Sequence, residues 1–153
     1  MQKILMVCLG NICRSPLAQG ILENKIVQAQ LNNIIVDSAG TGNWHSKSAP
    51  DPRSIEIAKK NGIDISHQKA RQFNTNDFNT FDKILVMDTS NFTNLLRLAS
   101  SENDSNKIKL ILDYSFPNKK ASVPDPYYGL ENGFETVYQL LDQACEEIIK
   151  ELI

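Results

Sequence analysis

Short apolar runs alternate with longer amphipathic stretches along this chain. The first apolar run covers residues 4–8 and ends at Gly10-Asn11, a pattern that is typical of a buried strand followed by a tight loop. Apolar residues then recur at helical spacing from Leu17 to Ala29, and Pro16 suits the first turn of such a helix. The beginning of the chain is therefore predicted to form a strand, a loop and a helix.

The alternation continues to the end of the chain. Further strands are predicted at residues 34–38, 83–87 and 107–112, an exposed loop at 40–50, and a long loop before Gly133. Helices are predicted from Asp51-Pro52 to Asn61-Gly62, after Asp88-Thr89-Ser90, and from Phe134 to Leu152. This order favours an α/β fold, a single-domain three-layer sandwich in which helices cover both faces of a central four-stranded parallel sheet.

Length and composition agree with one compact domain. The chain has 153 residues, of which 41% are hydrophobic, so residues 1–153 can bury a full core and are expected to form one domain. A formal net charge of -2 provides no broad positive field, which argues against nucleic acid or an anionic membrane as a partner. The apolar run near the N-terminus is too short for a membrane span and has no cleavage site of a targeting segment.

The three cysteines bear on location and on metal binding. Cys8 and Cys13 lie too close together for a secreted disulfide framework, so a reducing cytoplasm is expected. Cys145 falls on the apolar stripe of the last helix and is expected to be a core residue. A metal site built on Cys8 and Cys13 is disfavoured, because neither His45 nor His67 completes a usual ligand spacing. No metal or other cofactor is expected.

The loop after the first strand carries the candidate chemistry. In parallel α/β sheets, ligands bind at the carboxyl ends of the strands, where loops lead into helix N-termini. Unpaired N–H groups and the positive end of the helix dipole suit that place to phosphate. Gly10 and Asn11 are residue types that tolerate the left-handed backbone angles that such wrapping needs. The predicted anion-binding loop reads Cys8-Leu9-Gly10-Asn11-Ile12-Cys13-Arg14-Ser15.

Cys8 has the setting of a nucleophile. The thiolate is the reactive form, and a free thiol with a pKa of about 8.5 is mostly protonated at neutral pH. The loop amides, Arg14 and the Ser15 hydroxyl can stabilise negative sulfur, and the guanidinium fork can grip two phosphate oxygens. A strand-end cysteine is also often a small buried hydrophobe, and the Cys8 to Arg14 spacing alone is a weak signal. The position of the loop between a strand and a helix strengthens that signal.

The loop and several later segments resemble one enzyme family. Residues 8–16 are similar to the signature loop of the low-molecular-weight protein-tyrosine phosphatases. Later segments resemble the family in the same order, namely Val36-Asp37-Ser38-Ala39-Gly40, Ser66-His67, Ala70-Arg71, Phe81-Asp82, Val86-Met87-Asp88 and Asp125-Pro126-Tyr127-Tyr128-Gly129. Only residues 100–118 look idiosyncratic. The resemblance implies hydrolysis of phosphotyrosine through a cysteinyl-phosphate on Cys8, without a cofactor.

The resemblance also assigns a proton donor and pocket walls. Asp125 matches the acid that protonates the leaving phenolate and then activates water, although Asp-Pro is also common turn chemistry. Trp44 and Tyr127, with Tyr128, are expected to wall an aromatic pocket for a phenyl phosphate. The loop residues that are expected to contact substrate beside these walls are Leu9, Gly10, Asn11, Ile12, Cys13 and Ser15.

Two supporting roles follow from the same resemblance. Asn11, Ser15, Ser38 and His67 are expected to form a hydrogen-bonded network that holds the loop in shape. Cys13 resembles the neighbouring cysteine that forms a reversible disulfide with the nucleophile and protects it from irreversible oxidation. Without the resemblance, His67 is interpreted as an ordinary surface or core histidine.

Three other functions remain open. Arsenate reductases look similar at the phosphate loop but need a downstream pair of cysteines, and only Cys145 follows here. Protein-arginine phosphatases tend to carry Thr where Ile12 stands. A phosphate-binding module without catalysis would lack a nucleophile or an acid, whereas Cys8 and Asp125 are both present. The expected partner is therefore a phosphotyrosine-containing protein or a small aryl phosphate, which binds to a monomer or a weak homodimer.

Overall fold

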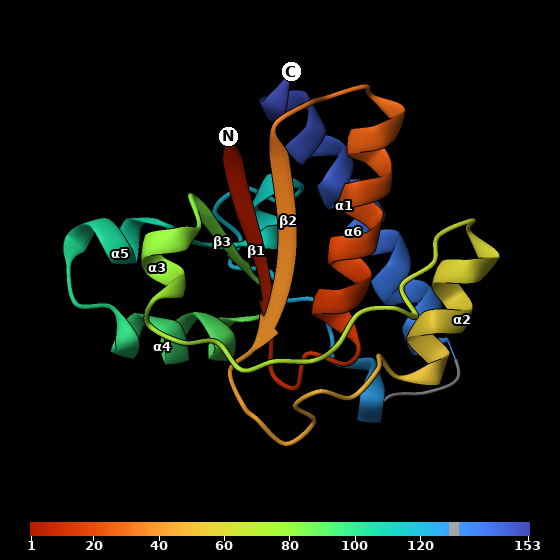
Figure 1. Ribbon diagram of the computed structural model, residues 1–153, viewed down its shortest axis with the longest axis horizontal. Helices are drawn as coiled ribbons and strands as arrows, with labels where there is room; N and C mark the ends of the chain where they lie inside the picture. Colours follow the sequence, from red (N-terminus) through yellow and green to blue (C-terminus); the bar gives the residue numbers. More distant parts are fainter. Residues whose placement is uncertain (129–131) are drawn as a thin grey trace.

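A central parallel sheet organises the protein. The computed structural model describes residues 1–128 and 132–153, with Tyr128 described by its backbone alone. Four strands in this part of the chain pair in parallel in the order β2-β1-β3-β4 (Figure 1). The strands are β1 (Gln2–Cys8), β2 (Ile34–Gly40), β3 (Lys83–Val86) and β4 (Ile108–Leu110).

Helices cover both faces of this sheet, as predicted (Figure 1). One face carries α1 (Arg14–Gln28), α2 (Pro52–Lys60) and α6 (Gly133–Leu152). The other carries α3 (Asp77–Thr80), α4 (Thr89–Leu98) and α5 (Glu102–Asn106), and the 3-10 helices η1 (Ile111–Tyr114) and η2 (Pro126–Tyr128) lie in the connection before α6. Across the described ranges, none of these helices has the length and apolar character needed to cross a membrane.

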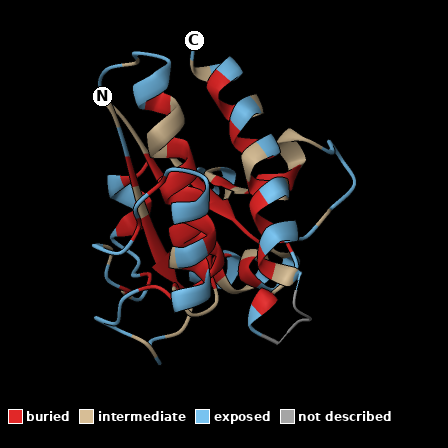
Figure 2. Cartoon of the chain, turned by 90° about the vertical axis from the view of Figure 1, so that its right-hand side faces the viewer, coloured by how far each residue is buried: buried red, intermediate tan, exposed pale blue. Residues whose placement is uncertain are grey.

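Side chains of β1 alternate between two cores. Ile4, Met6 and Cys8 join the cluster under α1 and α6, whereas Leu5 and Val7 join the cluster under α3 and α4. Strand side chains point to opposite faces in turn, so a strand that is buried on both sides reads as a continuous apolar run. Figure 2 shows the result, with buried residues on the sheet and on the inner sides of the helices, and exposed residues on the outer sides.

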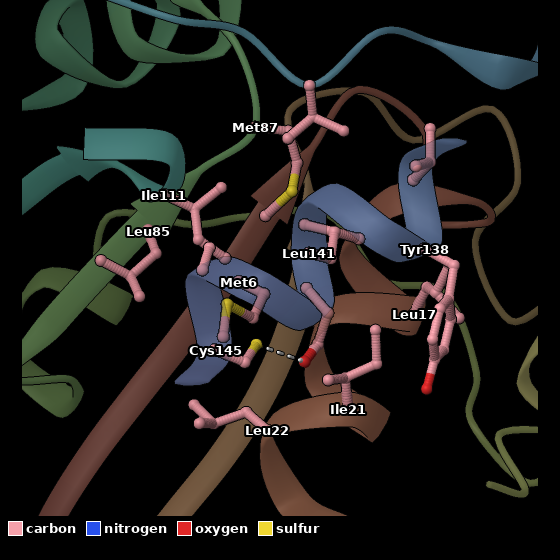
Figure 3. Packing of buried hydrophobic residues seen from close by; sticks show 14 of the residues in the cluster. Met6, Leu17, Ile21, Leu22, Leu85, Met87, Ile111, Tyr138, Leu141 and Cys145 are labelled. Carbon is pink, nitrogen blue, oxygen red and sulfur yellow. Dashed lines mark hydrogen bonds between the residues drawn. The ribbon is translucent and has the colours of Figure 1, made fainter. Parts of the chain in front are cut away.

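The larger core joins α1 and α6 to the sheet. Figure 3 shows side chains that point into one space from both the sheet and the helices, among them Met6 of β1, Leu17, Ile21 and Leu22 of α1, and Leu141 and Cys145 of α6. Cys145 is fully buried, and its Sγ lies 3.9 Å from the carbonyl oxygen of Ala18. This placement confirms the prediction that Cys145 belongs to the core.

Some predicted boundaries were wrong. The fourth strand was expected at residues 107–112 but ends at Leu110, and Ile111 and Leu112 begin the 3-10 helix η1. Both residues are buried beneath α6 and do not pair in the sheet. Packing against that helix therefore accounts for their apolar character. The short helices α3 and α5, and both 3-10 helices, had not been predicted. The caps of α2 and α4 by Asp51 and Asp88 are confirmed.

Candidate active site

The loop that follows β1 wraps around the sulfur of Cys8. The backbone N–H of Asn11 donates to Cys8 Sγ at 3.3 Å, and Asn11 has a left-handed φ of 58°. Gly10 does not share that conformation, contrary to expectation, since no positive φ is recorded for it. A different glycine is needed here, because a Cβ on Gly40 would lie 2.7 Å from the carbonyl oxygen of Leu9. The loop therefore needs Asn11 for its turn and Gly40 for its close approach to β2.

Ser15 places a hydroxyl group beside the sulfur. It lies in the first turn of α1, fully buried, with its Oγ 3.0 Å from Cys8 Sγ. Asn11 Nδ2 donates to the same Oγ at 2.7 Å, so the hydroxyl hydrogen can point either at the sulfur or at the carbonyl oxygen of Ala39, 3.4 Å away. The backbone N–H of Asn11 and the Ser15 hydroxyl are both placed where they can donate hydrogen bonds to a negatively charged group at the sulfur.

Asn11 is the centre of a buried hydrogen-bonded network. Its Nδ2 also donates to Ser38 Oγ at 3.0 Å, and its Oδ1 accepts from the backbone N–H of Arg71 at 3.0 Å. The expected contacts among Asn11, Ser15 and Ser38 are thus present. The expectation for His67 was wrong, because its side chain is exposed and makes no hydrogen bond among residues 1–128 and 132–153. The N–H of Arg71 satisfies the amide oxygen instead.

Arg71 fixes that N–H to the edge of the sheet. Its guanidinium donates to Asp37 of β2 at 3.1 and 3.3 Å and to Asp77 of α3 at 3.0 and 3.2 Å. Its carbonyl oxygen accepts from the backbone N–H of Gly40 at 2.8 Å. Two carboxylates on two elements therefore hold the segment that anchors Asn11.

Arg14 enters the pocket from the start of α1. Its side chain is 3% exposed, and Nη1 donates to Asp88 Oδ2 at 2.7 Å and to the carbonyl oxygen of Val123 at 2.9 Å. Nη2 lies 3.7 Å from Asp125 Oδ2. In the described part of the chain, Nε and Nη2 make no hydrogen bond, so these two groups are available to fork a phosphate.

Asp125 stands at the mouth of the pocket. Its Oδ1 accepts from the backbone N–H of Tyr127 at 3.0 Å, which fixes the carboxylate at the start of η2. Its side chain is 31% exposed, so one edge of the group can reach solvent. Cys8, Arg14 and Asp125 come from three separate segments and line one cavity.

The cavity holds about 400 Å³ and includes both predicted aromatic walls that can be described, Trp44 and Tyr127. Trp44 is 69% exposed and Tyr127 is 43% exposed. Loop residues on its lining are Leu9, Gly10, Ile12 and Cys13, whereas Asn11 and Ser15 lie behind it in the network above. The side chain of Tyr128 and residue Gly129 fall outside the described residues.

Cys13 lies in the same loop, and its thiol is buried. Burial raises the pKa of Cys13 from its ordinary 9.0 to about 12, and the nearby carboxylate of Asp51 adds to the effect. The loop is fastened to α2 at this point, because Ser54 Oγ donates to the carbonyl oxygen of Cys13 at 3.2 Å and Asp51 N donates to that of Ile12 at 2.8 Å. At neutral pH the Cys13 side chain is therefore a neutral thiol.

Sequence reasoning missed three residues of the site. His45 lines the cavity beside Trp44, and its ring packs close to Gly10. Asp88 binds Arg14, and its position directly after a strand was a usable signal for such a role. Arg71 supports Asn11 but gave no signal beyond its place in a family-like segment. Across residues 1–128 and 132–153, no group of three or more His, Cys, Asp or Glu side chains could hold a metal ion.

Comparison with known proteins agrees with this geometry. A family model described as low molecular weight phosphotyrosine protein phosphatase matches residues 3–153. The low molecular weight phosphotyrosine protein phosphatase of Schizosaccharomyces pombe is 44% identical over 152 residues, which cover 98% of this chain and 96% of that protein.

Solved structures are similar over nearly the whole chain. The protein tyrosine phosphatase from Entamoeba histolytica with Hepes in the active site gives a TM-score of 0.92 at 38% identity, covering 99% of this chain and 97% of that one. The Drosophila arginine phosphatase DARP gives 0.91 at 31% identity, covering 99% and 98%. Sequence, fold and pocket agree, and the chain belongs to the low molecular weight phosphotyrosine protein phosphatase family.

Proposed function

We propose that this protein hydrolyses phosphotyrosine monoesters, with Cys8 as the nucleophile, Arg14 as the phosphate-binding cation and Asp125 as the general acid and base. One observation carries the proposal. The sulfur of Cys8 lies on a cavity lined also by Arg14 and Asp125, with the backbone N–H of Asn11 donating to it at 3.3 Å and the Ser15 hydroxyl oxygen 3.0 Å away. This arrangement supplies a nucleophile, an anion-binding cation and an acid to one small space.

In the first step, the thiolate of Cys8 attacks phosphorus as the bond from phosphorus to the phenolic oxygen breaks. The departing oxygen takes a proton from Asp125, which must begin the step in its protonated form. The loop amides and the free edge of Arg14 bind the equatorial oxygens, where negative charge is concentrated. The products of this step are a neutral phenol and a cysteinyl-phosphate.

In the second step, water attacks the cysteinyl-phosphate and gives a proton to the carboxylate of Asp125. The sulfur–phosphorus bond breaks, and inorganic phosphate leaves. Ser15 donates a hydrogen bond to the sulfur as it regains negative charge, so that the leaving thiolate is stabilised. The cycle restores both the thiolate and the protonated acid.

The walls of the cavity support an aryl phosphate as substrate. Trp44 and Tyr127 are exposed aromatic side chains on a cavity of about 400 Å³, which suits stacking on a phenyl ring. The fold is shared with the arginine phosphatase DARP, so phosphoarginine is the rival substrate. Ile12 on the lining of the cavity supports tyrosine.

The proposed setting is a phosphoprotein substrate in a reducing, cytoplasmic compartment. Cys8, Cys13 and Cys145 are all free thiols, which supports that compartment. Every residue assigned to the reaction comes from one chain, so a monomer or a weak homodimer suffices, and residues 1–153 act as one catalytic domain.

Purified wild-type protein assayed with para-nitrophenyl phosphate under reducing conditions tests the proposal. We expect turnover that Cys8→Ser abolishes, while the variant still gains thermal stability from inorganic phosphate. An inactive wild-type protein would contradict the enzymatic proposal. Phosphotyrosine and phosphoarginine peptides separate the two phosphatase functions, and arsenate-dependent thiol oxidation would indicate a reductase.

A further inference from the structure

Arg53 is a cation that the proposed reaction does not use, and it lies beside residues 125–127, the segment that carries Asp125 and is called the acid segment below. Arg53 is the second residue of α2, and its guanidinium carbon lies 5.5 Å from the ring centre of Tyr127 and 4.7 Å from that of Phe134. Both distances fall within the range of about 6 Å over which a cation attracts an aromatic face. Tyr127 follows Asp125 by two residues, and Phe134 lies in the first turn of α6. One guanidinium therefore contacts the acid segment and the last helix together.

Arg53 is itself held rigidly. Its Nε and Nη2 donate to the two carboxylate oxygens of Asp51, each at 3.0 Å, in the two-point geometry that a planar guanidinium favours. These hydrogen bonds hold the pKa of Asp51 below its usual value. The backbone N–H of Asp51 donates to the carbonyl oxygen of Ile12 at 2.8 Å. The guanidinium is thus fixed relative to the phosphate loop.

We propose that Arg53 is a positioning residue that holds the carboxyl group of Asp125 in register with the phosphate loop. The link runs from Ile12 through Asp51 to the guanidinium, across to the ring of Tyr127, and from the Tyr127 backbone to Asp125 Oδ1 at 3.0 Å. A general acid acts only within hydrogen-bond reach of the leaving oxygen, so a loosely held Asp125 protonates the phenolate less often.

Direct recognition of an acidic substrate side chain is the competing use of Arg53, since the side chain is half-exposed. Its charge, however, is already shared with Asp51 through two hydrogen bonds, and its faces lie against two rings. Nη1 makes no hydrogen bond in the described part of the chain, but Nε is used by Asp51 and Nη2 is shared with it. The geometry therefore favours positioning over recognition.

The inference rests on the proposed function, because it requires Asp125 to be the acid, and its test separates the two. The test compares kcat/KM for phenyl phosphate, whose leaving group is strongly basic, with kcat/KM for para-nitrophenyl phosphate, whose leaving group needs little help. For Arg53→Met we expect kcat/KM to fall about tenfold with phenyl phosphate and less than about twofold with the nitrophenyl ester. The tenfold loss is only a part of the roughly hundredfold acceleration that a general acid contributes. Arg97→Met removes the same charge from an exposed position on α4 and should leave both values unchanged.

Asp125→Ala provides the internal reference. If it slows phenyl phosphate selectively while Arg53→Met slows both substrates alike or neither, the positioning role is wrong and the acid assignment stands. If Asp125→Ala also slows both substrates alike, the acid assignment fails and the positioning role fails with it. Thermal melting of every variant shows whether it is folded.

A second variant keeps the proposal testable if Arg53→Met does not fold. Tyr127→Leu removes the other half of the contact and also one wall of the aryl pocket, so both substrates should slow, and phenyl phosphate should slow about tenfold more than the nitrophenyl ester. In the double variant the two losses should not multiply, because both changes break one link. Losses that multiply would overturn the proposal, as would a Tyr127→Leu enzyme that slows both substrates by the same factor.

Discussion

Asp88 Oδ2 accepts a 2.7 Å hydrogen bond from Nη1 of Arg14, whose guanidinium is almost completely buried. The other oxygen, Oδ1, accepts from the backbone N–H of Asn91 at 2.7 Å and caps α4. One carboxylate therefore both orients the phosphate-binding cation and starts a helix. The two tasks can be separated by substitution, because asparagine is as good an N-cap as aspartate but carries no charge.

Asp88→Asn should leave the cap and remove the counter-charge of Arg14. Among the described residues, Arg14 then keeps only Asp125, at 3.7 Å, as a counter-charge, and this loss should cost up to about 3 kcal/mol. A misplaced guanidinium should lower kcat/KM by at least about tenfold. Asp88→Ala should lose about 1 kcal/mol more, because the cap is also lost. Urea unfolding and steady-state kinetics measure both effects. Equal stability of the two variants would show that the cap at Asp88 contributes nothing.

The contribution of the left-handed φ of Asn11 can also be measured apart from that of its side-chain hydrogen bonds. Asn11→Gly and Asn11→Ala both remove the hydrogen bonds to Ser15, Ser38 and Arg71, so both should lose activity to a similar extent. Alanine must also adopt a φ of 58°, which should make it less stable than glycine by about 1 kcal/mol. Chemical denaturation of the pair tests this difference. An alanine variant as stable as the glycine variant would mean that the loop changes its backbone.

The sheet, the long helices and the phosphate loop could be predicted because their signals are local. A strand buried on both faces is a continuous apolar run, and the caps at Asp51 and Asp88 precede their helices directly. The helices α3 and α5 have only 4 and 5 residues, too few to develop a periodic pattern. The start of the 3-10 helix η1 was predicted to be strand because Ile111 and Leu112 are apolar. They are apolar because they pack against α6 in the folded protein, not because they pair in the sheet.

The site was predictable where chemistry demands a residue type and unpredictable where only geometry decides. Cys8 and Arg14 were proposed because few side chains can attack phosphorus or bind phosphate, and Asp125 was proposed from its match to the acid of the family that the sequence resembles. The partner of the Asn11 amide oxygen is a backbone N–H, which any residue at position 71 would offer. Nothing local in the sequence indicates that this N–H belongs to the network and that the side chain of His67 does not.

The thiol of Cys13 should make protection against peroxide depend on pH. Peroxide converts the thiolate of Cys8 to a sulfenic acid, and the thiolate of Cys13 then attacks that sulfur, forming a disulfide and releasing hydroxide, which takes a proton from solvent to become water. Because the pKa of Cys13 is raised to about 12, its thiolate fraction increases nearly tenfold for each pH unit below that value. Disulfide formation should therefore become faster, relative to further oxidation, as the pH rises from about 6 to about 8.

Recovery of activity measures this competition. After peroxide treatment at each pH, dithiothreitol should restore more activity at the higher pH, and intact mass should show the loss of two hydrogens that marks the disulfide. Cys13→Ser should recover poorly at every pH, whereas Cys145→Ala should recover like the wild type because Cys145 is in the core. A Cys13→Ser enzyme that recovers as fully as the wild type would contradict the protective role.

Cys145 should make the fold sensitive to alkali. Complete burial raises the pKa of its thiol above the ordinary 9.0, so the folded chain keeps a proton that the unfolded chain releases. The unfolded state then binds fewer protons, and the free energy of unfolding must fall as the pH rises above about 9. One such group costs about 1.4 kcal/mol for each pH unit beyond that point. Cys13 and Tyr114, whose pKa values are raised to about 12 by burial, act in the same direction.

Cys145→Ala isolates the contribution of that thiol. At neutral pH the variant should lose about 1 kcal/mol, because a small cavity replaces the sulfur beside Met6 and Leu141. Between about pH 8 and pH 10 its free energy of unfolding should fall by about 1 kcal/mol less than that of the wild type, since one of the three groups no longer ionises on unfolding. Urea titrations at the two pH values give both quantities. Parallel losses in the two proteins would show that the Cys145 thiol ionises as readily in the folded chain as in the unfolded one, which its complete burial opposes.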